Sequence, residues 1–199
     1  MRTLMLLVAA IGIAFLLGRI SAQDVEPSCT MCSATFIDAD EIAQYERIGA
    51  ATGLTDQQVR SLDIGKSNVQ IALVHRGALD EPRPGSVAEH DLVTEVYYVL
   101  SGSGTNLTGP DLVDVVRRPP DNRAVQFLNG PGNNAAAVRN SVSYELTAGD
   151  VFVIPAGTGH QFTEINDHIT YLMVRVDPDK VVPLMDAQAS HAYLQENLR

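Results

Sequence analysis

Basic residues are scarce in this sequence: 14 Lys and Arg stand against 24 Asp and Glu among 199 residues, a formal net charge of −10. A surface with this excess of acid repels nucleic acid and anionic membranes, so neither is an expected partner. The sequence also lacks a glycine-rich phosphate-binding loop, because residues 63–67 (DIGKS) have no first glycine and are typical of a turn. These absences argue against nucleic-acid binding and against a phosphate loop.

Long apolar runs are missing as well. The apolar stretch 4–17 has about 14 residues, short of the roughly 20 that a membrane-spanning helix needs. It is typical of the apolar part of a secretory signal peptide, with Ile20–Ala22 as the cleavage box before Gln23. We therefore predict that residues 1–22 are a signal peptide and that the protein is secreted or periplasmic. Because Arg19 directly follows the run, an uncleaved anchor stays open as the one expected membrane contact.

Cysteine occurs only at Cys29 and Cys32. Their C-x-x-C spacing is also found in zinc and redox sites, but zinc would need two further ligands and none lies nearby. A thioredoxin-like motif would lie between a strand and a helix, whereas this pair follows the signal peptide directly. The spacing and the predicted export favour a local disulfide in an oxidising compartment.

Short runs rich in β-branched residues follow one another from Asn68 onward, separated by Gly, Pro, Asn or Asp. Many short strands with this spacing indicate an all-β sandwich or barrel, which we assign to residues 66–180. The stretch 117–137 is rich in Pro and Gly and predicts a long loop, with room for a short strand at 124–128.

Helices are predicted on both sides of the β region. Residues 23–65 read as a leader followed by a helical segment, with Asp38 or Asp40 as the N-cap candidate. Residues 181–199 predict a C-terminal helix.

Two segments of the β region carry His, Glu, Gly and Pro at regular spacings. In the first, a histidine is followed after four residues by a glutamate and after six more by a glycine. In the second, a histidine closes a run of glycines and a proline that permits a tight turn. The first segment contains His90, Glu95 and Gly102, and the second contains Gly149, Pro155, Gly157 and His160.

These two segments resemble, in order and spacing, the two motifs of the cupin superfamily. The likeness departs at Ala88, where the first motif has a further histidine, and at Glu164, where the second ends in asparagine. The resemblance implies an all-β fold, a small cupin β-barrel of the double-stranded β-helix or jelly-roll type, with short N-terminal and C-terminal helices. It also implies a homodimer.

A metal site follows from the resemblance and can be checked against strand geometry. Side chains alternate along a strand, so Ala88 and His90 share a face, while Glu95 and His160 enter from neighbouring strands. Two imidazoles and one carboxylate suit Fe, Mn, Zn, Ni or Co as divalent ions, with coordination positions left for water and substrate. A lone inward histidine is more simply a hydrogen-bonded core residue, but the matched set favours a metal.

The ligand position that Ala88 leaves open has three candidate replacements. Water is the first. A bulge that turns Glu89 or Asp91 inward is the second, and His75 on a neighbouring strand is the third. The two other histidines are predicted to be surface residues: His168 and His191.

Tyr97 is the candidate catalytic residue, because it stands two positions after Glu95 and shares its inward face. The cupin branch that cleaves dimethylsulfoniopropionate looks similar here, with a tyrosine in proton abstraction, and a nearby cation would lower the pKa of the phenol from about 10. The alternative is an aromatic wall of the cavity. Tyr98 should face the opposite way, and Glu164 either supports the site or is an ordinary carboxylate at a strand end.

The resulting expectation is an exported, metal-binding cupin that acts on a small organic molecule by dioxygenase, isomerase or lyase chemistry. The alternative is a non-catalytic cupin that binds a small ligand and whose metal site has eroded at Ala88. A secreted structural protein is the third possibility, since one fold hosts many functions.

Overall fold

The computed structural model describes residues 26–198, so the predicted signal peptide at residues 1–22 lies outside the described part of the chain. The chain divides into two units, with the boundary between Cys32 and Ser33. In the described part of the first unit, Cys29 and Cys32 form a disulfide, as the sequence predicts. None of the helices within residues 26–198 combines the length and the apolarity that crossing a membrane requires.

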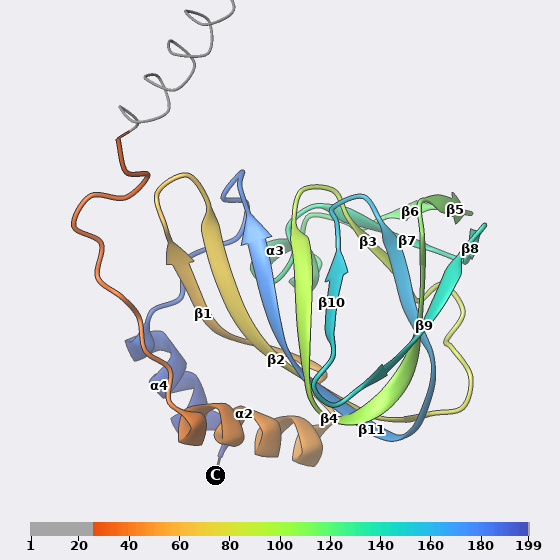
Figure 1. Cartoon of the computed structure of the whole chain (residues 1–199), viewed down its shortest axis with the longest axis horizontal. Helices are drawn as coiled ribbons and strands as arrows, with labels where there is room; N and C mark the ends of the chain where they lie inside the picture. The colour runs from red at the N-terminus through yellow and green to blue at the C-terminus, as the bar shows by residue number, and fades with distance from the viewer. Residues whose placement is uncertain (1–25, 199) are drawn as a thin grey trace, which may run out of the picture. The chain divides into compact units, whose positions relative to one another are not determined.

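The second unit is built mainly from antiparallel strands that curve into a barrel (Figure 1). The larger sheet in the described residues has nine strands, in the order β1-β2-β11-β3-β7-β6, and β4 joins it through β11 and carries β9 and β10. Strands β5 and β8 form a separate pair. The bounds are β1 Asp56–Asp63, β2 Asn68–Leu79, β3 Val87–His90, β4 Thr94–Gly109, β5 Asp111–Val113, β6 Val116–Arg117, β7 Gly132–Ala135, β8 Ala137–Arg139, β9 Val142–Thr147, β10 Val151–Ile154 and β11 Gly159–Asp177.

The long strands β4 and β11 pair with each other and bend, which lets each take part in both walls of the barrel. Gly102 in β4 has a φ of 72°, which is costly for residues other than glycine. A Cβ at this position would come within 1.9 Å of the carbonyl oxygen of His168. The glycine of the first motif is therefore required by the backbone geometry.

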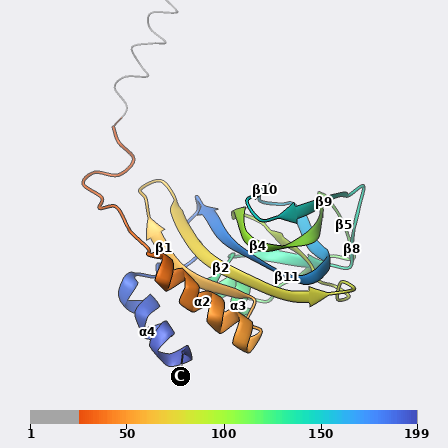
Figure 2. The same ribbon diagram turned by 60° about the horizontal axis from the view of Figure 1, so that its bottom comes forward.

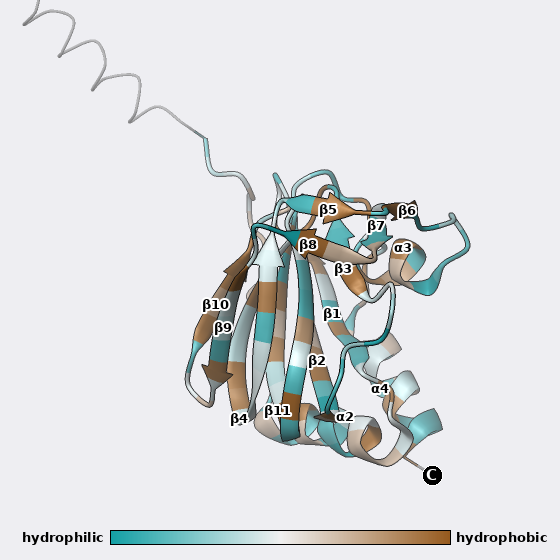
Figure 3. Ribbon diagram, turned by 90° about the vertical axis from the view of Figure 1, so that its right-hand side faces the viewer, coloured by the Kyte–Doolittle hydropathy of each residue, from teal (hydrophilic) through white to brown (hydrophobic). Residues whose placement is uncertain are grey.

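Side chains alternate between the two faces of each strand, and those on the inner face fill the barrel interior. Figure 3 shows polar and apolar bands alternating along β2, β4 and β11. The inward side chains form one apolar cluster, whose largest members include Tyr97, Tyr171, Phe162 and Ile165. The rings of Tyr97 and Tyr171 stack with their centroids 4.3 Å apart, directly beside the motif residues.

Helices α2 (Ala39–Thr52) and α4 (Ala187–Asn197) pack beside β1 and β2, as Figures 1 and 2 show. A second apolar cluster holds them there and includes Tyr45 and Ile48 of α2 and Leu194 of α4. The side chain of Asp38 caps α2 by accepting a hydrogen bond from the backbone N–H of Glu41 at 2.7 Å. Both terminal helices and the Asp38 cap are confirmed.

Three details differ from the sequence prediction, and the first is that β7 lies inside the stretch 117–137 predicted as a loop, where it pairs with β3. The sheet begins at β1, inside the range 23–65 that we expected to be leader and helix. A run this short gives no periodicity of its own, and its side chains become buried by pairing with β2. The short strand expected at 124–128 is wrong, because Arg123–Phe127 form helix α3, whose first turn is capped by the side chain of Asn122.

Candidate metal centre

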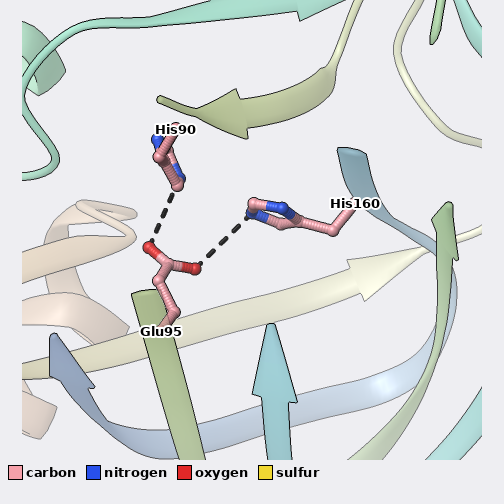
Figure 4. A group of neighbouring side chains, drawn as sticks. All are labelled: His90, Glu95 and His160. Atoms are coloured by element: carbon pink, nitrogen blue, oxygen red, sulfur yellow. Dashed lines mark ion pairs between the residues drawn. The ribbon is translucent and has the colours of Figure 1, made fainter. Parts of the chain in front are cut away.

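Three strands bring His90, Glu95 and His160 together, as Figure 4 shows. His90 is the last residue of β3, and Glu95 and His160 are the second residues of β4 and β11. Nε2 of His90 lies 3.3 Å from Oε1 of Glu95, and Nε2 of His160 lies 3.5 Å from Oε2. All three side chains are buried. In residues 26–198 no other group of three or more His, Cys, Asp and Glu converges in this way.

A backbone hydrogen bond joins the two motifs. The N–H of Gly157 donates to the carbonyl oxygen of His90 at 2.7 Å. Gly157 has a φ of 79°, which suits glycine, so the turn before β11 can approach the end of β3. The contact fixes His90 relative to the turn that carries His160.

The carboxylate of Glu95 is surrounded by hydrogen-bond donors. The side-chain amide of Asn129 donates to Oε1 at 2.6 Å, and the hydroxyl of Tyr97 donates to Oε2 at 2.8 Å. The guanidinium of Arg175 lies 3.5 Å from Oε1 and also pairs with Asp56. This network fixes the orientation of the carboxylate.

The electrostatics keep Glu95 and His160 in the protonation states that a metal requires. Burial alone would raise the pKa of Glu95, but the facing His90, His160 and Arg175 hold it well below the ordinary value, so Glu95 is ionised. Burial lowers the pKa of His160 to about 4, so its imidazole is neutral near pH 7. Nδ1 of His160 lies 3.1 Å from the carbonyl oxygen of Thr158, which places the proton on Nδ1 and directs the Nε2 lone pair toward Glu95.

His90 differs from His160 in the partner of its Nδ1 atom. Nη1 of Arg118 lies 3.2 Å from that nitrogen, and arginine can only donate. Two further acceptors, the side chain of Asn134 and the backbone of Asn133, hold Arg118 in place. The contact favours the tautomer of His90 with its proton on Nε2, and a metal at Nε2 has to displace that proton. Arg118 therefore weakens His90 as a ligand.

The donor set nevertheless fits a divalent transition metal or zinc. The candidate ligand atoms all lie within 4.8 Å of one another. Ligands bound at about 2.0–2.2 Å in tetrahedral or octahedral geometry are separated by roughly 3–3.6 Å, close to the spacings between Glu95 and each imidazole. The neutral imidazole of His160 and the ionised carboxylate of Glu95 also match the protonation states that metal binding demands.

We expect Arg118→Gln to tighten metal binding by about tenfold, because the amide oxygen can accept from Nδ1–H of His90 and fix the favourable tautomer. Arg117→Gln is the matched control: it removes the same charge next in sequence, from an exposed side chain paired with Asp91. Competitive chelator titration measures both. Equally tightened metal binding in both variants would show that the lost positive charge, and not the tautomer of His90, sets the metal affinity.

The register of β3 places Ala88 on the same side as His90, as strand alternation predicts. Ala88 pairs directly with His160 across β3 and β11 and lines the adjacent cavity. No side chain of the described residues replaces the missing histidine at this position, so water remains the candidate fourth ligand.

The alternative register, with acidic residues turned inward, is not observed. Strands β3 and β7 pair without a register shift. Glu89 accepts a hydrogen bond from the side-chain amide of Asn133 at 2.6 Å, and Asp91 pairs with Arg117. His75 lies outside the cluster, because its Nδ1 meets the hydroxyl of Thr170 at 2.8 Å.

Tyr97 lies where the sequence places it, buried on the inward face with its hydroxyl on Glu95. Burial and the charge of Glu95 raise its pKa well above 10, the opposite of the direction expected for a base beside a cation. Tyr98 faces the opposite way and is exposed, as predicted.

The remaining predicted residues lie apart from the cluster. Glu164 is exposed beside a register shift in β11, so it is an ordinary strand carboxylate. His191 is exposed, as predicted, whereas His168 is half-buried and stacks on His75.

A cavity of about 460 Å³ opens beside the cluster. His160, Tyr97 and Ala88 contribute to its wall, and the end of β2 and the C-terminal end of α2 form the other side. A volume of this size suits a small organic molecule.

Three residues of the site escaped prediction. Arg175 carried a signal, because it follows Tyr171 and Met173 at alternate positions and a charge on the inward face of an apolar strand demands a partner. The sequence gives no such indication for Asn129 and Arg118. They lie in the stretch predicted as a loop, where no periodicity fixes the direction of a side chain.

Comparison with protein families gives one match. Residues 128–198, a little over a third of the chain, match the model of the AraC-like ligand binding domain. The matched segment includes His160 but neither His90 nor Glu95. No curated protein sequence matches the chain.

Solved structures resemble the chain loosely. The protein BH2720 from Bacillus halodurans shares 14% identity, with 82% of this chain and 97% of that chain covered and a TM-score of 0.41. A structure from the DMSP lyases RdDddP and RnDddQII shares 19%, with 54% and 37% covered and a TM-score of 0.32. The Cnp3 cupin domain of Schizosaccharomyces pombe shares 10%, with 61% and 64% covered and a TM-score of 0.36. At these TM-scores no activity carries over.

Proposed function

We propose that this protein, whose fold is that of the cupin superfamily, binds a divalent metal ion through His90, Glu95 and His160 and acts as an enzyme on a small organic molecule. The observation that carries the proposal is the convergence of two buried imidazoles and an ionised carboxylate beside a cavity. A buried carboxylate and two buried histidines at these distances are an expensive arrangement unless they serve a ligand.

A metal held by His90, Glu95 and His160 would supply Lewis acidity, and the choice among Fe, Mn, Zn, Ni and Co stays open. The residues of the chain supply the rest. Asn129 and Arg175 orient the Glu95 carboxylate. Tyr97 contributes to the cavity wall, and its hydroxyl, which donates to Glu95, is the candidate group for exchanging a proton with a substrate.

A binding module without catalysis is the second candidate, because the matched family model describes a ligand-binding domain. The alanine at position 88 and the Arg118 contact with His90 both favour it, since each weakens the metal site. In this candidate the cavity holds a ligand that is not transformed.

Metal analysis and a turnover screen separate the two candidates. Protein purified without added metal is analysed for bound ions, loaded with Fe(II), Mn(II) or Zn(II), and incubated with a panel of small organic molecules. Mass change of a substrate or uptake of O₂ by the wild type, absent in His160→Ala, supports the enzyme. Metal-independent binding without turnover supports the binding module.

We expect Ala88→His to tighten metal binding, because residue 88 pairs with His160 and shares the face of His90. The gain is one or two powers of ten, about 1.4 kcal/mol for each, if the imidazole fits without strain. Turnover falls in the same variant, since the new ligand takes a position that substrate would need. Chelator titration checks the affinity, and an unchanged value would place residue 88 away from the ion.

Export and dimer formation remain part of the proposal. The Cys29–Cys32 disulfide suits the oxidising compartment that the predicted signal peptide implies. Apolar side chains are exposed on the outer face of β4 and β10, a surface that a second copy could cover: Tyr98, Leu100, Val151 and Val153. Light scattering on the purified mature protein would test the homodimer.

A further inference from the structure

The cavity beside the candidate metal centre is positively charged in a strongly acidic protein. Its ionisable lining residues other than Tyr97 are Arg76, Arg83, His75 and His160. No Asp or Glu among residues 26–198 contributes to the lining, although the chain has 24 acidic residues. Charge of one sign on the wall of a cavity selects a ligand of the opposite sign.

Arg76 is the inward-facing cation of this cavity. It lies on the inner face of β2, in phase with Ala72 and Val74 of the barrel core. Its guanidinium carbon lies 5.2 Å from the centroid of the Phe162 ring, and Nε donates to the hydroxyl of Tyr171 at 3.2 Å. The stacking and the hydrogen bond fix the plane of the guanidinium.

The charge of Arg76 has no counter-ion in the described part of the chain. No carboxylate of residues 26–198 lies within ion-pair distance of it. The hydrogen bond to Tyr171 uses only Nε, which leaves the two terminal nitrogens without a protein acceptor among those residues. By contrast, the buried Arg60 and Arg175 are both paired with carboxylates. An oriented guanidinium with two free nitrogens matches the two oxygens of a carboxylate.

We propose that the cavity takes a small organic carboxylate, whose carboxylate group binds Arg76 while the rest of the molecule extends toward His160 and Tyr97. The inference names the substrate class of the proposed function and rests on it for the role of the metal. The binding of the anion to Arg76 itself requires no metal. A monoanion is favoured over phosphate, because Arg83 is exposed and only one inward arginine faces the site.

The test uses benzoate and its uncharged analogue benzamide as probes of metal-stripped, full mature protein at low salt, with binding measured by ligand-observed NMR. Wild type should bind benzoate about tenfold more tightly than benzamide, the size of one charge-assisted hydrogen bond. Arg76→Gln should abolish this preference, and Arg76→Lys should restore part of it. Arg47→Gln removes an exposed arginine of α2 that does not line the cavity, and it should bind as wild type does.

Equal binding of the two probes by wild type would overturn the proposal without any variant, so a misfolded Arg76→Gln protein cannot hide the answer. A preference for benzoate that is retained by folded Arg76→Gln would also overturn the proposal. Displacement of benzoate by an equal concentration of inorganic phosphate would overturn it too. Metal-stripped wild type separates the two proposals. It should prefer benzoate although no metal is bound, so failure of the metal proposal leaves the anion site standing.

Discussion

His160→Ala and Glu95→Ala are each expected to lose most of the bound metal. Each change removes one of three protein ligands, worth about 3 kcal/mol if the free energy of a four-ligand zinc site is shared among its ligands. That loss weakens affinity by about two powers of ten, from a site already short of one ligand at Ala88. Metal content after dialysis, measured by mass spectrometry, and chelator titration both report the effect.

The control for this experiment is His191→Ala, which removes an exposed histidine of α4 far from β3 in the sequence. It should retain metal as wild type does. Folding should survive in His160→Ala, because the barrel is held by the apolar cluster of β2, β4 and β11. A full equivalent of metal in both site variants would contradict the ligand assignment.

Glu41→Gln is expected to destabilise the fold by about 3 kcal/mol, because it leaves the buried guanidinium of Arg60 without its counter-ion. The two side chains are only 7% and 2% exposed and join α2 to β1 through contacts of 2.7 and 2.9 Å. Ser190 of α4 donates to the same carboxylate at 2.6 Å, so the pair holds three elements together. Urea denaturation gives the free energy of unfolding.

Two further variants isolate the buried ion pair. Replacing both partners, as Glu41→Leu with Arg60→Leu, should recover most of the stability, since no unpaired charge remains. Asp63→Asn breaks the exposed pair with Lys180 and should leave unfolding almost unchanged. If the double variant is as unstable as Glu41→Gln, packing and not the uncompensated charge causes the loss of stability.

The same pair predicts an acid dependence of stability. Burial alone would raise the pKa of Glu41, but the hydrogen bonds from Arg60 and Ser190 and the charge of Arg60 outweigh it and place the pKa below the ordinary 4.5. A depressed pKa in the folded state contributes stability at higher pH that is lost as the pH falls through that pKa. The difference in the free energy of unfolding between wild type and Glu41→Gln should therefore become smaller below pH 4.5.

Local pattern predicted the barrel, and the resemblance of two segments to the cupin motifs predicted the three-residue cluster. Alternation placed Ala88 with His90 and Tyr97 with Glu95, and the glycines marked turns that the structure needs at Gly102 and Gly157. These inferences depend only on period-two geometry and on the conformational freedom of glycine.

The surroundings of the cluster could not be predicted in the same way. Asn129 and Arg118 reach the site from the stretch 117–137, where strand β7 pairs with β3 and brings a loop against the ligands. That pairing joins residues more than forty positions apart, and no local pattern encodes it. The consequence is chemical, because Arg118 favours the tautomer of His90 that does not bind metal.

Anomalous X-ray diffraction from crystals of the protein loaded with Zn(II) or Mn(II) tests the central claim most directly. The account predicts one peak about 2.0–2.2 Å from Nε2 of His90, Nε2 of His160 and an oxygen of Glu95. It also predicts that Arg118 lies beyond hydrogen-bond distance of Nδ1 of His90, since that nitrogen has to carry the proton when Nε2 binds the metal. Absence of a peak between these three side chains at saturating metal, or a peak at another cluster, would contradict it.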